Sequence, residues 1–337
     1  MGKSKSIVAR VERAAIAAPL SDEAEVIKKA GIELMDIDAA TEDEIIAKAR
    51  DADVVFIVRT AFTRRVFENL PRLRAVIRCG VGYDNVDVDA ATDNKVLVVN
   101  VPDFCFEEVS NHAIVLLIAC AKKLVQLDHT LKTAGWKTSR QVLDPMGSIW
   151  GQTLGIVGCG NIGRMTARKA RCFGLNVIGS DPYVDRKLAS ESGITLKSLP
   201  EVMGESDYVT LHPCLNRETF HLIGEKELAL MKPSAYLINT SRGSIVDESA
   251  LIRALQDKKI AGAGLDVFEK DPIDPDNPLL KMGHVIVTPH SASYCEASFK
   301  RLRTSVGEEA VRVALGRWPR NVVNSGVTPK VDLVKEG

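Results

Sequence analysis

The chain has 337 residues, and 44 Lys plus Arg balance 44 Asp plus Glu, so its formal net charge is zero. That balance argues against a general nucleic-acid-binding protein, which needs a basic face, and a 45 % hydrophobic and 26 % charged composition is typical of a globular chain. At about 100–200 residues per domain, the length favours two domains. No apolar run approaches the roughly 20 residues of a membrane-spanning helix. Seven scattered cysteines without a C-x-x-C pair fit a reducing compartment, so we expect a cytoplasmic protein.

The first hundred residues alternate between strand-like and helix-like segments. Gly31 and a Thr41–Glu44 capping box mark a helix end and a helix start. We predict strands at residues 6–11, 32–37, 54–58, 75–78 and 96–99, and helices at 22–30, 42–51 and 88–94. Strands that alternate with helices predict a parallel sheet.

The alternation of strand-like and helix-like segments then stops. Residues 107–124 read as one long helix with an apolar face. Residues 125–150 show no clear periodicity, which predicts an arm or an extended loop.

A second alternating series begins near Thr153. We predict its strands at residues 154–158, 175–180, 208–211, 235–239, 261–267 and 285–288. Six such strands with helices between them are what a doubly wound nucleotide-binding sheet requires. Residues 298–314 predict a final amphipathic helix, and 317–337 a polar tail.

The motif Gly158-x-Gly160-x-x-Gly163 follows the first strand of this series and opens a helix. In that context the glycines allow a tight turn, the approach of a pyrophosphate and close helix packing, and the helix amides face the phosphates. Asn161 and Ile162 begin the helix. Asp181 ends the next strand, at the spacing of an acid that binds the adenosine ribose. Because a carboxylate there repels a 2′-phosphate, we expect NAD (NADH) rather than NADP.

Three further segments follow strands of the second series, at residues 238–243, 264–272 and 288–292. Strand carboxyl ends share one edge, so these segments can converge. Hydride transfer to a keto acid needs a proton donor, a cation for the carboxylate and an acid beside the donor, which favours its protonated form. His290, Arg242 and Asp271 supply these groups. Each alone has a structural alternative: a hydrogen-bonded histidine, a surface arginine, and an aspartate that starts a turn.

These segments, together with residues 78–87, resemble the D-isomer-specific 2-hydroxyacid dehydrogenase family over nearly the whole chain. The resemblance implies an α/β fold of two Rossmann-like or flavodoxin-like parallel-sheet domains with a cleft between them. It implies a discontinuous substrate-binding domain of residues 1–104 plus 295–337 and an NAD-binding domain of residues 105–294. It also implies a homodimer, to which the 125–150 arm contributes.

The resemblance further implies roles for single residues. Arg242 would bind the substrate carboxylate and His290 would exchange the proton with the substrate. Further substrate contacts are expected at Arg59, Val81, Gly82 and Ser293. Asp266 would meet the nicotinamide amide, and the other expected cofactor contacts are His212, Pro213, Thr219, Thr240, Ser241, Arg242 and His290. No metal site is expected.

One departure from the family concerns the acid beside His290. The family usually has glutamate before the proline of the third segment, where this chain has Asp271. Glu269 is the alternative, but two residues earlier on an extended segment it lies about 6–7 Å away. We therefore assign the role to Asp271.

Two functions remain open from the sequence. The first is an NAD-dependent oxidoreductase that transfers a hydride between NAD(H) and C2 of a small 2-keto or D-2-hydroxy acid. The second is an NAD(H)-sensing binding protein like the family's co-repressor branch, which the run 181–183, Tyr294 and Glu296 resemble. That branch has tryptophan where this chain has Ser293. The Arg242, Asp271 and His290 set favours the enzyme.

Overall fold

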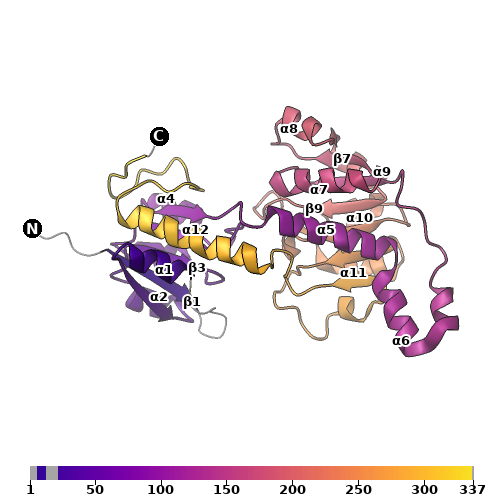
Figure 1. Cartoon of the computed structure of the whole chain (residues 1–337), viewed down its shortest axis with the longest axis horizontal. Helices are drawn as coiled ribbons and strands as arrows, with labels where there is room; N and C mark the ends of the chain where they lie inside the picture. Colours follow the sequence, from indigo (N-terminus) through magenta and orange to yellow (C-terminus); the bar gives the residue numbers. More distant parts are fainter. Residues whose placement is uncertain (1–5, 13–21, 336–337) are drawn as a thin grey trace, which may run out of the picture. The chain divides into compact units, whose positions relative to one another are not determined.

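The computed structural model describes residues 6–12 and 22–335. The chain divides into two compact units (Figure 1). The first comprises Met1–Phe104 and Cys295–Gly337, and the second comprises Cys105–Tyr294. Each unit has its own parallel sheet, which confirms the α/β class.

In the described part of the first unit, five parallel strands form a sheet of order β2-β1-β3-β4-β5. They are β1 (Ile7–Glu12), β2 (Glu33–Asp38), β3 (Val54–Ile57), β4 (Ala75–Arg78) and β5 (Leu97–Asn100). Figure 1 shows the last helix of the chain, α12, lying beside the first helix, α1. The helices are α1 (Asp22–Lys29), α2 (Glu42–Lys48), α3 (Arg64–Asn69), α4 (Val88–Asp93) and α12 (Glu296–Ala314).

The second unit, described throughout, holds a seven-stranded parallel sheet of order β12-β11-β10-β9-β6-β7-β8. The chain starts in the middle and builds outward to both sides, so its switch point lies between β6 and β9. The strands are β6 (Thr153–Val157), β7 (Asn176–Ser180), β8 (Thr195–Leu196), β9 (Tyr208–Leu211), β10 (Tyr236–Asn239), β11 (Gly262–Leu265) and β12 (Val285–Val287). All six predicted strands are confirmed, and β8 was missed because two residues give no pattern.

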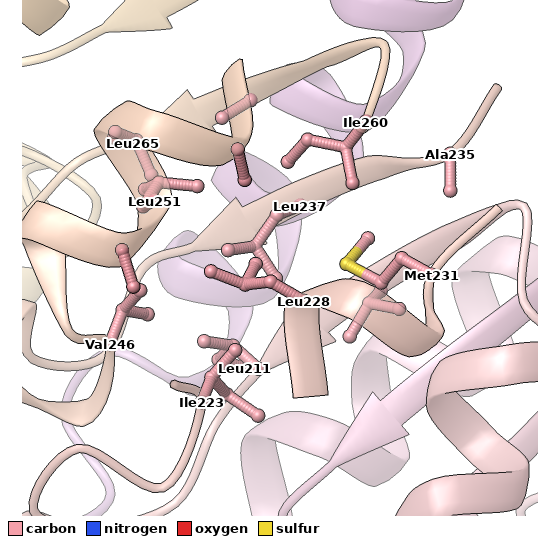
Figure 2. Close-up of a cluster of buried hydrophobic side chains, with 14 of the residues drawn as sticks. Leu211, Ile223, Leu228, Met231, Ala235, Leu237, Val246, Leu251, Ile260 and Leu265 are labelled. Carbon is pink, nitrogen blue, oxygen red and sulfur yellow. The ribbon is translucent and has the colours of Figure 1, made fainter. Parts of the chain in front are cut away.

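Helices cover this sheet, and α5 and α7 lie side by side (Figure 1). The unit contains α5 (Phe106–Ala121), α6 (Leu124–Gln141), α7 (Asn161–Cys172), α8 (Arg186–Glu191), α9 (Leu199–Glu205), α10 (Glu225–Leu230) and α11 (Glu248–Gln256). A cluster of buried side chains locks the strands to these helices (Figure 2). Leu211, Leu237 and Leu265, the inward residues of β9, β10 and β11, pack with Leu228 and Leu251. The strands whose ends carry the candidate site are therefore anchored in this core.

The prediction of an irregular segment at 125–150 is wrong for its first two thirds. Residues Leu124–Gln141 form α6, which breaks at Gly135 (φ 76°, ψ 179°). The predicted single helix 107–124 also ends earlier, at Ala121, because Lys123 adopts a left-handed φ of 49°. Leu124, Leu127 and Leu131 lie at helical spacing and were the available signal, but Gly135 interrupts the pattern. Trp136 of α6 is 72 % exposed.

Among the residues that the structure describes, no helix is long and apolar enough to cross a bilayer.

Candidate active site

The predicted cofactor and catalytic segments leave the carboxyl ends of β6, β7, β9, β10, β11 and β12. Backbone hydrogen bonds tie the last three together. Asp266 N donates to Asn239 O over 2.9 Å, and His290 N donates to Asp266 O over 2.8 Å. The loops of Arg242, Asp266 and His290 thus form one connected edge.

The glycine loop between β6 and α7 has the predicted geometry. Gly158 has a φ of 87°, and a methyl group there would lie 2.5 Å from Pro213 N. A methyl group on Gly163 would lie 2.2 Å from Gly158 O. Around Gly160, by contrast, an added methyl group meets no atom within 4 Å. The loop is therefore tightly packed at Gly158 and Gly163 and open at Gly160, the position predicted to face a pyrophosphate.

The start of α7 and the end of β7 fit a dinucleotide. The first amides of a helix have no partner within the helix, and no side chain caps α7 at Gly160. Asp181 follows β7, and its Oδ2 accepts a hydrogen bond of 2.8 Å from Cys159 N. Its Oδ1 accepts from Tyr183 N and Val184 N. The carboxylate is thus held beside the glycine loop, with Asn161 and Ile162 at the start of the helix.

Two side chains near this loop, the buried Cys159 and the half-buried His212, stay uncharged. Burial raises the pKa of the Cys159 thiol to about 12. Burial lowers the pKa of His212 to about 3, and its Nε2 lies 3.1 Å from Thr210 Oγ1. His212 and Pro213 pack on Gly158 through their backbones. The side chains of Cys159 and His212 therefore place no charge beside the glycine loop.

The predicted residue Thr219 belongs to the turn that follows β9. Its Oγ1 accepts from Asn216 N over 2.8 Å and donates to Cys214 O over 2.6 Å. In the structure Thr219 therefore closes this turn.

The loop after β10 carries Arg242 and is shaped by a residue that sequence reasoning missed. Asn239 is 1 % exposed; its Oδ1 accepts from Ser241 N and Oγ, and its Nδ2 donates to Arg242 O over 2.9 Å. Thr240 Oγ1 is buried, and none of the described residues gives it a hydrogen-bond partner. A buried polar atom of this kind suits a ligand contact.

A second missed residue, Gly243, joins the Arg242 loop to the segment that carries Asp271. A methyl group on Gly243 would lie 1.8 Å from the carbonyl carbon of Phe268, so only glycine permits this approach. A glycine directly after a strand-end arginine was the available sequence signal.

The structure pairs His290 with Asp271. His290 Nδ1 lies 2.6 Å from Asp271 Oδ2, and the histidine has a left-handed φ of 53°. Glu269, the alternative acid, instead contacts Nε2 of His221. Residues 269–272 form a bend rather than the extended segment expected from the sequence, and the side chains of Glu269 and Asp271 contact different histidines.

Asp266 is 0 % exposed. Its Oδ1 accepts from Thr288 Oγ1 over 2.5 Å and from Ser291 N over 2.9 Å, and its Oδ2 accepts from Ala292 N over 2.8 Å. In the structure this carboxylate holds the 288–292 loop. The contact of Asp266 with the nicotinamide amide stays a prediction.

The remaining predicted substrate residues occupy two places. Ser293 follows the His290 loop in the second unit. In the first unit, Arg59 follows β3, and Val81 and Gly82 follow β4. Asn100 Nδ2 donates to Val81 O over 2.7 Å and so fixes that turn. In the stretches 6–12 and 22–335, no group of three or more His, Cys, Asp or Glu side chains is placed to hold a metal ion.

A doubly wound sheet, an open glycine loop and a histidine–carboxylate pair, on loops bonded to the one that carries Arg242, are typical of a dinucleotide-dependent oxidoreductase. Residues 114–292 match the family described as D-isomer specific 2-hydroxyacid dehydrogenase, NAD binding domain. The chain is 40 % identical to glyoxylate reductase of Korarchaeum cryptofilum over 285 residues, 84 % of this chain and 86 % of that protein. It is 39 % identical to D-3-phosphoglycerate dehydrogenase of Methanocaldococcus jannaschii over 299 residues, 88 % of this chain and 56 % of that protein.

Solved structures agree with these relatives. D-lactate dehydrogenase from Aquifex aeolicus, complexed with NAD and lactic acid, superposes with a TM-score of 0.81 at 28 % identity, covering 94 % of this chain and 98 % of that one. An NADPH-dependent glyoxylate/hydroxypyruvate reductase from Sinorhizobium meliloti, in complex with NADP and malonate, superposes with a TM-score of 0.83 at 28 % identity. The match covers 98 % of this chain and 100 % of that one. The chain belongs to the D-isomer specific 2-hydroxyacid dehydrogenase family. It is an enzyme, a D-2-hydroxyacid dehydrogenase with NAD or NADP as acceptor.

Proposed function

We propose that this chain reduces a small 2-keto acid to the D-2-hydroxy acid with His290 as the general acid, Asp271 as its partner and Arg242 as the carboxylate-binding residue. The observation that carries the proposal is the 2.6 Å contact between His290 and Asp271, on loops bonded to the one that holds Arg242. Bound NADH supplies the hydride.

The chain's own groups carry out the remaining chemistry. The planar guanidinium of Arg242 matches a carboxylate and holds the keto acid in one orientation. As hydride adds to C2, negative charge develops on the carbonyl oxygen, and His290 donates a proton to it. Asp271 stabilises the imidazolium before that transfer and orients the ring. In the oxidation direction, neutral His290 takes the hydroxyl proton.

NAD is the proposed cofactor. Its pyrophosphate would face Gly158, Gly160 and the amides of Asn161, Ile162 and Gly163, and Asp181 would accept hydrogen bonds from the ribose hydroxyls. The Asp181 carboxylate beside that ribose opposes the 2′-phosphate of NADP. Further cofactor contacts are proposed for His212, Pro213, Thr219, Thr240, Ser241, Arg242, Asp266 and His290. The family resemblance adds Arg59, Val81, Gly82 and Ser293 as substrate contacts.

We also propose a cytoplasmic homodimer that uses α6. This helix exposes Leu124, Leu131 and Trp136, and the first two side chains are 60 % and 45 % exposed. Burying apolar surface of this kind favours association. Sedimentation of the wild type beside a Trp136→Lys variant tests it: a monomeric wild type would contradict the proposal.

The experiment for the main proposal measures NADH oxidation with glyoxylate, pyruvate, hydroxypyruvate, phenylpyruvate and 3-phosphohydroxypyruvate. Turnover of at least one acid, with preference for NADH over NADPH, supports the assignment. Tight NADH binding without turnover of any acid would contradict it and favour an NAD(H)-sensing protein.

A further inference from the structure

Helix α5 carries a further histidine, His112, which contacts the loop that holds His290. His112 Nε2 lies 2.9 Å from Thr288 Oγ1 and 3.6 Å from Asp266 Oδ1. The His112 side chain is 21 % exposed, and Asp266 is fully buried. None of the roles above assigns a task to this histidine.

The numbers of donors and acceptors in this group decide which atom donates in each contact. Both oxygens of Asp266 face backbone N–H donors, from Ser291 and Ala292, so the carboxylate acts as an acceptor. A threonine hydroxyl has one proton, and the 2.5 Å contact directs it to Asp266 Oδ1. Thr288 Oγ1 must therefore accept from His112, which requires a proton on His112 Nε2.

The chain of contacts continues to His290. Asp266 accepts from Ser291 N and Ala292 N, directly after His290, and its own backbone oxygen accepts from His290 N over 2.8 Å. The backbone of His290 is thus held on both sides by one buried residue. These hydrogen bonds stabilise the left-handed backbone conformation of His290, in which its ring contacts Asp271.

We propose that His112 is a positioning residue for the reaction. Its Nε2–H donates to Thr288, which fixes Asp266 and through it the backbone of the general acid. This inference rests on the proposed role of His290. The donor end lies on a helix, whereas the receiving end lies on a loop, so the helix supplies the rigid reference for the loop.

The test compares His112→Leu, which removes the donor, with His112→Gln, whose amide restores an N–H group. We expect His112→Leu to lower kcat about tenfold, equivalent to about 1.4 kcal/mol. The Kd of NADH should stay unchanged, and the isotope effect with NADH deuterated at the transferred position should rise because hydride transfer becomes limiting. His112→Gln should recover most of the rate. His284→Leu, at an exposed position before β12, is the matched control.

A Thr288→Val variant breaks the same connection at its second member. It should reproduce the effect of His112→Leu, and the double variant should add nothing further. If His112→Leu does not fold, Thr288→Val against Thr288→Ser makes the same comparison. Equal rates for His112→Leu and wild type, or equal losses for His112→Leu and His112→Gln, would overturn the inference.

A second readout does not depend on turnover. Nitrogen NMR of the histidine rings, with the His290 signals assigned through His290→Gln, reports the His290 environment directly. We expect His112→Leu to shift those signals and His112→Gln to restore them. Unshifted signals contradict the positioning role, whereas a wild type that reduces no keto acid contradicts only the proposed function.

Discussion

The Nδ1 atom of His290 lies 2.6 Å from Oδ2 of Asp271, which belongs to a bend where Glu269 contacts a different histidine. A carboxylate at this distance stabilises the protonated imidazole that reduction requires. Asp271→Asn removes the charged partner of the ring and should lower kcat/KM for keto-acid reduction at least about tenfold, since a hydrogen bond to a charged group contributes about 1.5–3 kcal/mol. Steady-state NADH oxidation measures this loss.

Glu269→Gln is the matched control for that loss. Glu269 contacts His221, whereas Asp271 contacts His290, so Glu269→Gln should keep the wild-type kcat/KM. A loss of kcat/KM in Glu269→Gln together with wild-type activity in Asp271→Asn would show that the acid is misassigned.

Asp181 is expected to decide between the two dinucleotides. Asp181→Ala should weaken NADH binding about tenfold, since a charge-assisted hydrogen bond contributes about 1.5–3 kcal/mol when it is buried. Asp181→Arg should favour NADPH. Asp185, which caps α8 nearby, provides the control variant Asp185→Asn. Fluorescence titration of both cofactors measures the outcome, and unchanged affinities in Asp181→Arg would refute the ribose assignment.

Glu12 holds the turn that carries Arg59. It is 1 % exposed, and its Oε2 accepts from Val58 N and Arg59 N over 2.8 Å each. Its Oε1 accepts from Thr60 Oγ1 over 2.8 Å. Glu12→Ala leaves buried donors unpaired and should destabilise the protein by about 1–3 kcal/mol, with a smaller loss in Glu12→Gln. Urea unfolding measures this, and equal stability of Glu12→Ala and wild type would show that the turn does not need the carboxylate.

His212 should make the protein sensitive to acid. Its pKa falls from an ordinary 6.5 to about 3 in the folded state, so the native protein holds this ring neutral. The resulting stability is present above pH 6.5 and is lost as the pH falls toward 3, by at most about 1.4 kcal/mol per unit. His212→Gln should therefore lose less stability between pH 7 and pH 5 than wild type does. Thermal unfolding at the two pH values gives the comparison; parallel losses in both proteins would be the contrary result.

The sequence predicts the strands of both sheets well because buried parallel strands are short continuous runs of apolar residues. The glycine loop was also predictable, since Gly158 and Gly163 permit close packing in the structure and Gly160 leaves open space beside the loop. Helix α6 was missed, because Gly135 interrupts the spacing of its apolar residues and most of its side chains stay exposed.

The candidate site divides in the same way. Residue type and position after a strand indicate His290, Asp271 and Arg242, because an imidazole, a carboxylate and a guanidinium each have a specific task in this chemistry. Asn239, Gly243 and His112 act through backbone and loop contacts, and such contacts depend on tertiary distances that no local pattern encodes. Asp266 shows the intermediate case, in which the residue was identified but its loop-holding contacts were not.

The most direct measurement compares NADH oxidation by wild type and His290→Gln, with the Kd of NADH determined for both. The variant should bind NADH as wild type does and reduce the preferred keto acid about 10²–10⁴-fold more slowly, the usual contribution of a general acid. A variant that reduces the acid at the wild-type rate would contradict the assignment of His290 as the proton donor.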